Sequence, residues 1–122
     1  MNEFEEWAQS TVDSLRRLGK LPWNWDGYNS PPLTRYALRT AHTFVTSTAH
    51  LALPEPEVVP VSGGGVNLVF AGSAAEIEFE FLPDGSTVVC GTLPTFGEEA
   101  DFEAEMPNLA YAEQLIRSVL GI

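Results

Sequence analysis

Apolar residues recur every three or four positions in three stretches of the chain, and this spacing predicts three helices. Acids at the start of the first stretch, arginines at its end and Gly19 after it suit the helix dipole and a helix stop. In the second stretch, Thr34 follows two prolines and is a suitable N-cap. The helices are expected at about residues 2–18, 34–50 and 108–120.

From residue 57 apolar and polar residues alternate, which is the period of a β-strand with one buried face. The clearest run is residues 76–81, and similar runs predict strands at about 66–70, 87–91 and 101–106. Glycine-containing segments at 62–65 and 82–86 predict hairpin turns. We therefore predict one α+β domain over residues 1–122, with two N-terminal helices, an antiparallel β-meander of about four strands, a C-terminal helix, and the helices on one face of the sheet.

The composition is that of a folded, soluble chain. Of its 122 residues 44% are hydrophobic, and its single cysteine, Cys90, cannot form an internal disulfide. The N-terminus lacks the basic and apolar regions of a signal peptide, and no apolar run approaches the roughly 20 residues that span a bilayer. We expect a cytoplasmic protein.

Negative charge is concentrated in the later part of the chain. Residues 1–39 contain five acids and five bases and are neutral. Residues 40–116 contain twelve acids and no lysine or arginine, so only Arg117 offsets them and the net charge is −11. This balance disfavours direct binding to nucleic-acid phosphates and favours either simple solubility or a basic partner.

Much of this charge is predicted to lie in two rows on one face of the sheet. Their apolar neighbours must face a common core, so both rows are expected on the exposed face, separated by the strand at 87–91. Two interpretations stay open, a solvated face and a protein docking surface; a flat row favours neither a metal site nor acid–base catalysis. The rows consist of Glu76, Glu78 and Glu80, and of Asp101, Glu103 and Glu105.

Other candidate chemistry has simpler interpretations. His42 and His50 lie eight residues apart, which is not the spacing of a metal-binding pair on a helix. Cys90, in a valine-rich strand, is expected in the core. The Gly63–Gly65 run is followed by neither a lysine nor a helix, so it is interpreted as a turn and not a phosphate loop. We predict no catalytic residue, metal or cofactor.

Residues 21–32, LPWNWDGYNSPP, combine two tryptophans and a tyrosine in a stretch typical of a loop. Asp26-Gly27 predicts a turn within it. One interpretation is a buried plug between the first two helices, which the burial of aromatic rings favours. The other is an aromatic contact surface formed by Trp23, Trp25 and Tyr28.

The segment WNWDGY, the following Pro31-Pro32, the PEPE at 54–57, Pro60 and the GGVNL at 64–68 resemble a family of small acidic bacterial and phage proteins with a WxWDGY…PEP…GGVxL pattern. The resemblance covers about residues 20–90 and departs at Tyr28-Asn29-Ser30, where the family often has Tyr-Gly-Ala. It implies the same order of elements and no particular activity.

Three functional hypotheses follow. The first is a non-enzymatic acidic module that binds a basic protein, as an antitoxin, immunity protein or phage-defence accessory binds a toxin, nuclease or nucleotide-handling enzyme. The second is a DNA mimic that inhibits a nucleic-acid-binding protein. The third is an enzyme with an aromatic-lined pocket. Self-association into a homodimer is also open.

Overall fold

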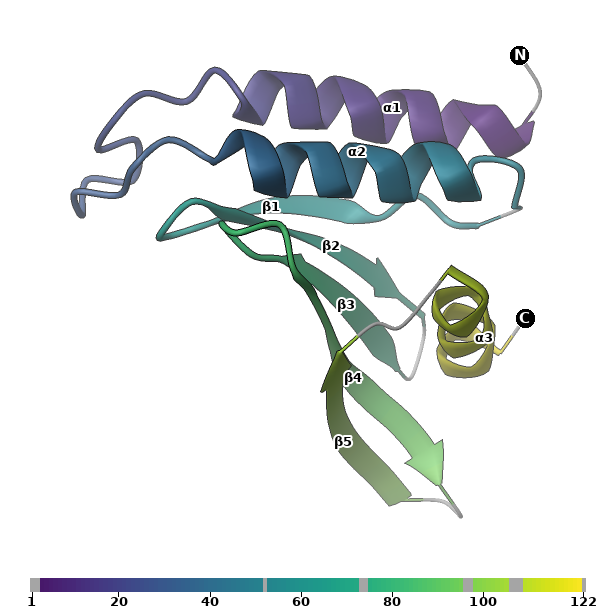
Figure 1. Cartoon of the computed structure of the whole chain (residues 1–122). Coiled ribbons are helices and arrows are strands. Elements are labelled where there is room, and N and C mark those ends of the chain that lie inside the picture. Colours follow the sequence, from purple (N-terminus) through teal and green to yellow (C-terminus); the bar gives the residue numbers. More distant parts are fainter. Residues whose placement is uncertain (1–2, 52, 73–74, 96–97, 106–108, 122) are drawn as a thin grey trace.

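The structure is a computed structural model that describes residues 3–51, 53–72, 75–95, 98–105 and 109–121, with side chains for 6–51, 53–72, 75–91 and 110–121. Within these residues the chain forms three helices and five strands (Figure 1). Their order is α1 (Glu3–Leu18), α2 (Arg35–Thr48), β1 (Glu57–Val61), β2 (Gly65–Ala71), β3 (Glu76–Phe81), β4 (Thr87–Thr95), β5 (Glu98–Glu105) and α3 (Leu109–Leu120).

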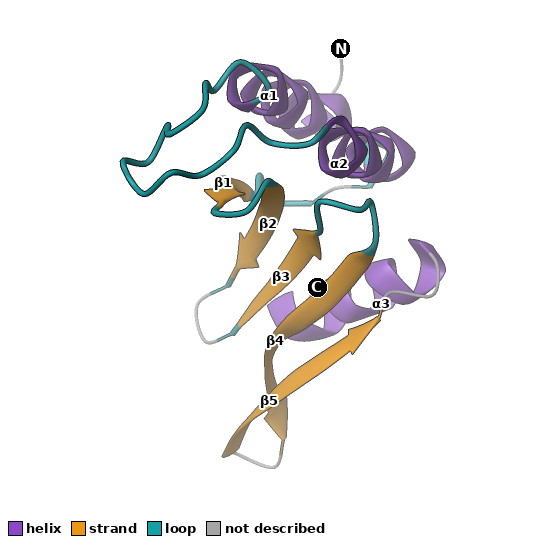
Figure 2. Ribbon diagram, turned by 60° about the vertical axis from the view of Figure 1, so that its left-hand side comes forward, coloured by secondary structure: helices purple, strands orange, loops and turns teal. Residues whose placement is uncertain are grey.

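The strands form an antiparallel meander in the order β1-β2-β3-β4-β5. Helices α1 and α2 lie side by side over one end of the sheet, and α3 packs against β2, β3 and β4 (Figures 1 and 2). The loop between α1 and α2 projects beyond the ends of both helices (Figure 1). None of the helices in the described part of the chain combines the length and apolar content that a membrane span requires.

The core lies between the helices and the sheet face that they cover. Phe44 of α2 contacts Phe79 and Phe81 of β3, with ring centroids 4.8 and 5.7 Å apart. Phe70 of β2 meets Phe79 edge-on at 6.0 Å, and Trp7 of α1 meets Phe70 at 6.3 Å. These contacts join both N-terminal helices to β2 and β3.

The predicted fold class is confirmed, with differences at the ends of elements. The meander has five strands, because the proline-containing segment at 57–61 pairs with β2 as an edge strand, where proline is tolerated. Strand β4 continues four residues beyond the predicted end at Gly91, and β5 begins at Glu98, before the predicted residue 101. Thr34 caps α2 by accepting a hydrogen bond from the Ala37 amide at 3.1 Å, as predicted.

We predict that Phe79→Ala lowers the free energy of unfolding by about 3–5 kcal/mol, because the ring is fully buried and its removal leaves a cavity between Phe44 and Phe70. Urea unfolding followed by circular dichroism measures this loss. Glu76→Ala, an exposed change on the same strand, is the control and should stay within about 0.5 kcal/mol of the parent. Equal effects of the two variants would contradict the assigned core.

Candidate functional site

The sheet has one buried face and one open face. On the helix-covered face of β2, β3 and β4 the alternating apolar residues from Val66 to Val89 are fully buried. The strand residues between them are exposed or half-buried, and β1 contributes to the same open face through its register with β2. The described side chains of the open face are Glu57, Val59, Val61, Asn67, Val69, Ala71, Glu76, Glu78, Glu80, Val88 and Cys90.

The two predicted carboxylate rows are separated by one strand, as expected. Strand β4 lies between β3 and β5, with Cys90 paired to Glu78 on one side and to Glu103 on the other. Val88 likewise separates Glu80 from Glu105, and Asp101 pairs with Thr92 further along. The side chains of Asp101, Glu103 and Glu105 lie outside the described residues, so only their backbone positions are assigned.

Within the first row, Glu78 is held by its neighbours. Asn67 of β2 donates a hydrogen bond from Nδ2 to Glu78 Oε1, and Cys90 donates from Sγ to Oε2 at 3.8 Å. Asn67 Oδ1 is enclosed and accepts no hydrogen bond in the described part of the chain. Glu78 is thus engaged within the sheet, whereas Glu76 and Glu80 remain the better placed of the three for an outside partner.

The expectation that Cys90 lies in the core is wrong. The neighbouring residue, Val89, takes the buried position, and Cys90 is half-buried on the open face beside Glu78. The sequence Thr-Val-Val-Cys allowed either alternation, and the pairing of Val89 with Phe79 decides between them.

The open face also has an apolar part, of which only the contribution of β1 was missed in the prediction from sequence. Val59 and Val61 of β1, Val69 of β2 and Val88 of β4 are all half-buried there. The alternation of Glu57, Val59 and Val61 was a usable signal, but the neighbouring prolines obscured it. The face is therefore a mixture of valines and carboxylates and not a purely acidic surface.

Residues 21–32, which we call the aromatic loop, are held in place by hydrogen bonds within the loop. The Asn24 amide donates to the Ser30 carbonyl at 2.7 Å, and the Asn29 amide donates to Asn24 Oδ1 at 2.8 Å. Asn24, Gly27 and Asn29 adopt positive φ values of 63°, 80° and 62°, a region that asparagine and glycine tolerate best. Asn29 thus occupies a conformation that few residue types other than asparagine and glycine adopt readily.

Asp26 organises the tip of this loop and its contact with the sheet. Its carboxylate accepts from the Tyr28 amide at 2.9 Å and from the Ser30 hydroxyl at 2.5 Å. The Ser30 hydroxyl also lies 2.7 Å from that of Ser62 in the β1–β2 turn. The hydrogen bond from Ser30, followed by that from the Tyr28 amide, lowers the pKa of Asp26 below its ordinary value of 3.8.

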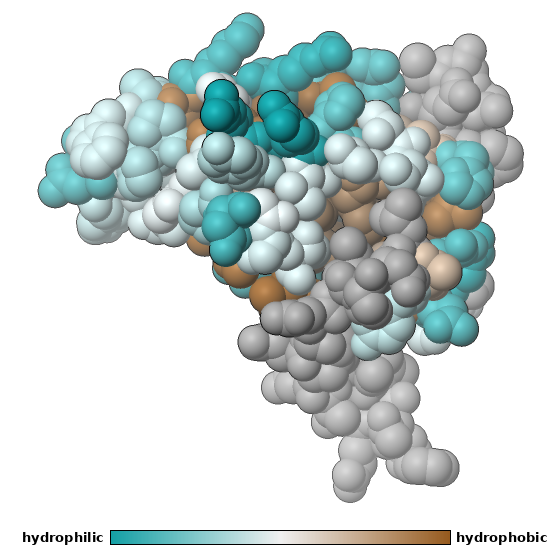
Figure 3. Space-filling view, viewed as in Figure 1, coloured by the Kyte–Doolittle hydropathy of each residue, from teal (hydrophilic) through white to brown (hydrophobic). Residues whose placement is uncertain are grey.

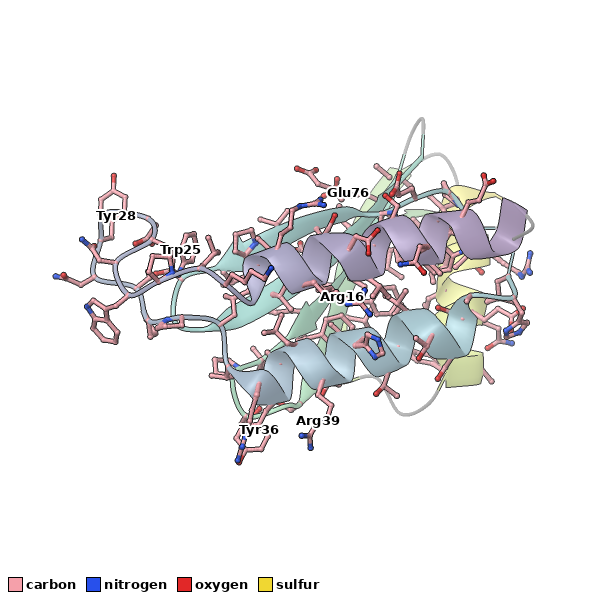
Figure 4. All side chains as sticks on the ribbon, turned by 90° about the horizontal axis from the view of Figure 1, so that it is seen from above. Arg16, Trp25, Tyr28, Tyr36, Arg39 and Glu76 are labelled. Carbon is pink, nitrogen blue, oxygen red and sulfur yellow. The ribbon has the colours of Figure 1, made fainter. Side chains whose placement is uncertain are left out.

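The three loop aromatics have different environments. Trp25 is half-buried and donates from Nε1 to the Pro31 carbonyl at 2.9 Å. Trp23 and Tyr28 are 64% and 84% exposed, and Tyr28 lies at the far tip of the loop (Figure 4). Trp25 is therefore the most buried of the three, but its hydrogen bond stays within the loop, which projects beyond the ends of α1 and α2, so no contact in the described part of the chain makes it a plug between these helices. The tight turn at 23–26 replaces the extended segment predicted there, and Trp23 and Tyr28 are exposed.

Helices α1 and α2, which form the helix layer over the sheet, enclose a hollow between them. Figure 3 shows hydrophilic side chains over this layer, and Figure 4 shows the Arg16 side chain between the two helices. His42 borders this hollow, and both His42 and His50 are exposed. Among the described residues, no three His, Cys, Asp or Glu side chains are grouped closely enough to hold a metal ion.

No protein-family model matches the chain, and comparisons with curated proteins and with solved structures give no match either. The family resemblance therefore stays a prediction.

We predict that Trp25→Ala lowers the free energy of unfolding by about 2 kcal/mol, because it removes half-buried aromatic surface and the hydrogen bond to Pro31. Trp23→Ala is the matched control and should change stability by less than about 0.5 kcal/mol, because its ring is exposed. Thermal and urea unfolding of the two variants measure the difference. A larger loss for Trp23→Ala would show that the burial is assigned to the wrong indole.

We also predict that the Asp26 carboxyl titrates below 3.8, as followed by NMR of its side-chain carbon. Because folding lowers this pKa, the carboxylate stabilises the fold above pH 3.8, and that contribution disappears as pH falls through the lowered value. Ser30→Ala should move the Asp26 pKa upward. Asp84, whose pKa is lowered by its own hydrogen bonds from Ser86, should not move. An unchanged Asp26 in Ser30→Ala would refute the assigned cause.

Proposed function

We propose that this protein is a non-enzymatic binding module that docks a basic protein on the open face of its sheet. In this role it is the small acidic member of a bacterial or phage gene pair, such as an antitoxin, an immunity protein or a defence accessory. The basic partner is a toxin, a nuclease or a nucleotide-handling enzyme.

The observation that supports this proposal is the mixed surface of the open face. Half-buried valines supply apolar contact area, and exposed Glu76 and half-buried Glu80 supply negative charge beside it. Protein interfaces combine such an apolar part with charged residues that select the partner. Lysine and arginine are absent from residues 40–116, so no base of these strands neutralises the carboxylates.

The same surface favours a protein partner over the alternative of DNA mimicry. A DNA mimic has to offer carboxylates in place of phosphates over a long surface, whereas four valines share this face and Glu78 is engaged with Asn67. Competition between this chain and duplex DNA for the captured partner distinguishes the two functions.

We predict that Glu76→Lys combined with Glu80→Lys weakens binding to the basic partner about 30-fold or more, because attraction becomes repulsion at the interface. The partner is first captured on the immobilised parent chain from the native host at low salt and identified. Its affinity is then measured by calorimetry at two salt concentrations. The parent complex should weaken with salt, and the double variant should be less salt-sensitive.

The matched control for this experiment is Glu6→Lys combined with Glu55→Lys. It makes the same change in net charge at two exposed positions outside the open face. If both double variants lose affinity equally, net charge alone drives the association and the open face is not the docking surface.

A further inference from the structure

The hollow between α1 and α2 is lined by apolar residues together with two arginines and a histidine. Its volume is about 260 Å³, and its apolar lining comes from Val12 and Leu15 of α1 and Leu38 of α2, with Gly19 after α1 beside them. Arg16, Arg39 and His42 border it, and all three are exposed. The volume lies below the roughly 300–1,000 Å³ of small-molecule sites, which favours an inserted side chain over a whole ligand.

The aromatic loop offers a side chain of the matching kind. Trp23 exposes 64% of its surface on a loop whose backbone is already fixed by internal hydrogen bonds, so little backbone conformational entropy is lost when the ring is bound. An indole ring fills an apolar hollow well, and a guanidinium over its face adds a cation–π contact. Figure 4 shows the Arg16 side chain lying over the gap between α1 and α2.

The charge distribution allows two copies to meet through their helix layers. Residues 1–39, which form α1, the aromatic loop and the start of α2, are neutral in total despite the net charge of −11. When two helix layers face each other, the acidic open faces of the two sheets point away from one another. Self-association by this route therefore avoids most of the repulsion that opposes other arrangements.

From these three observations we propose that the protein forms a two-fold symmetric dimer in which Trp23 of each copy inserts into the α1–α2 hollow of the other. The loop directly follows α1, and the hollow includes the last turns of α1, so a two-fold axis near this end can form both contacts at once. Both acidic faces remain outward, so the dimer can dock two basic partners. The dimer itself does not depend on the proposed function.

Sedimentation velocity of the purified full chain over a concentration series at moderate salt tests this proposal. The parent chain should show a reversible monomer–dimer equilibrium that strengthens when salt screens the net charge. Trp23→Ala should raise the dimer dissociation constant about 30-fold, the effect typical of an interfacial aromatic hot spot. Tyr36→Ala, which removes an exposed ring on α2 that does not border the hollow, is the control and should leave it unchanged.

Two adjacent arginines give a matched test of the hollow. Arg16 borders it and Arg17 does not, although both are exposed in the last turn of α1. Arg16→Glu should weaken the dimer about tenfold, and Arg17→Glu should have little effect. In a mixture of Trp23→Ala and Arg16→Glu chains, the mixed dimer keeps one intact contact, in which Trp23 of the Arg16→Glu chain enters the unchanged hollow of the other chain. Its free energy of association should therefore be more favourable than the average of those of the two variant homodimers.

A parent chain that stays monomeric throughout the series would overturn the proposal, and so would a dimer that Trp23→Ala does not weaken. If Trp23 is needed only for binding the captured basic partner while the chain stays monomeric, the loop contacts that partner and the dimer is likewise refuted.

Discussion

The contact of Phe44 with Phe79 and Phe81 decides which face of the sheet is covered. It fixes α2 on β3, and the edge-on contacts of Phe70 with Phe79 and with Trp7 add β2 and α1 to the same core. Because side chains alternate along a strand, the burial of these rings assigns every intervening residue to the other face. The open face with its glutamates and valines is thus a direct consequence of the core.

The aromatic loop depends on the same arrangement through its ends. Ser30 contacts Ser62 in the β1–β2 turn, and Thr34 donates its amide to the Gly64 carbonyl at 2.9 Å and its hydroxyl to the Pro83 carbonyl at 2.7 Å. These bonds join the loop and the start of α2 to two turns at one end of the sheet. The exposed Trp23 therefore lies on a loop with a fixed backbone. This loop belongs to the electrically neutral first part of the chain and not to the acidic sheet.

The periodicity of the sequence was sufficient to predict the fold because local and tertiary preferences agree. Glu76 to Phe81 alternates without exception, and this strand lies at the centre of the sheet. The positions of Glu76, Glu78 and Glu80 on the open face followed from the same alternation. The hydrogen bonds of the open face were less predictable. Asn67 of β2 is paired with Glu80 of β3 but donates to Glu78, its diagonal neighbour, and this contact follows only from the pairing register of the two strands.

The loop and Cys90 were predicted less well, for physical reasons. Asn24 and Asn29 adopt positive φ values in the loop that leaves Trp23 exposed, and residue types alone do not specify such conformations. For Cys90, two valines in succession left the alternation ambiguous until pairing with Phe79 fixed it. The hollow between α1 and α2 depends on how closely the helices approach near Gly19 and Leu38, a distance that a single sequence does not encode locally.

Carboxyl footprinting of the chain alone and in complex with its captured basic partner tests directly whether the open face is the docking surface. We expect Glu76 and Glu80 to become protected from modification in the complex, while Glu6 and Glu55 react as they do in the free chain. Protection of Glu6 or Glu55 with full reactivity at Glu76 and Glu80 would contradict this expectation, because the partner would then contact a surface other than the open face of the sheet.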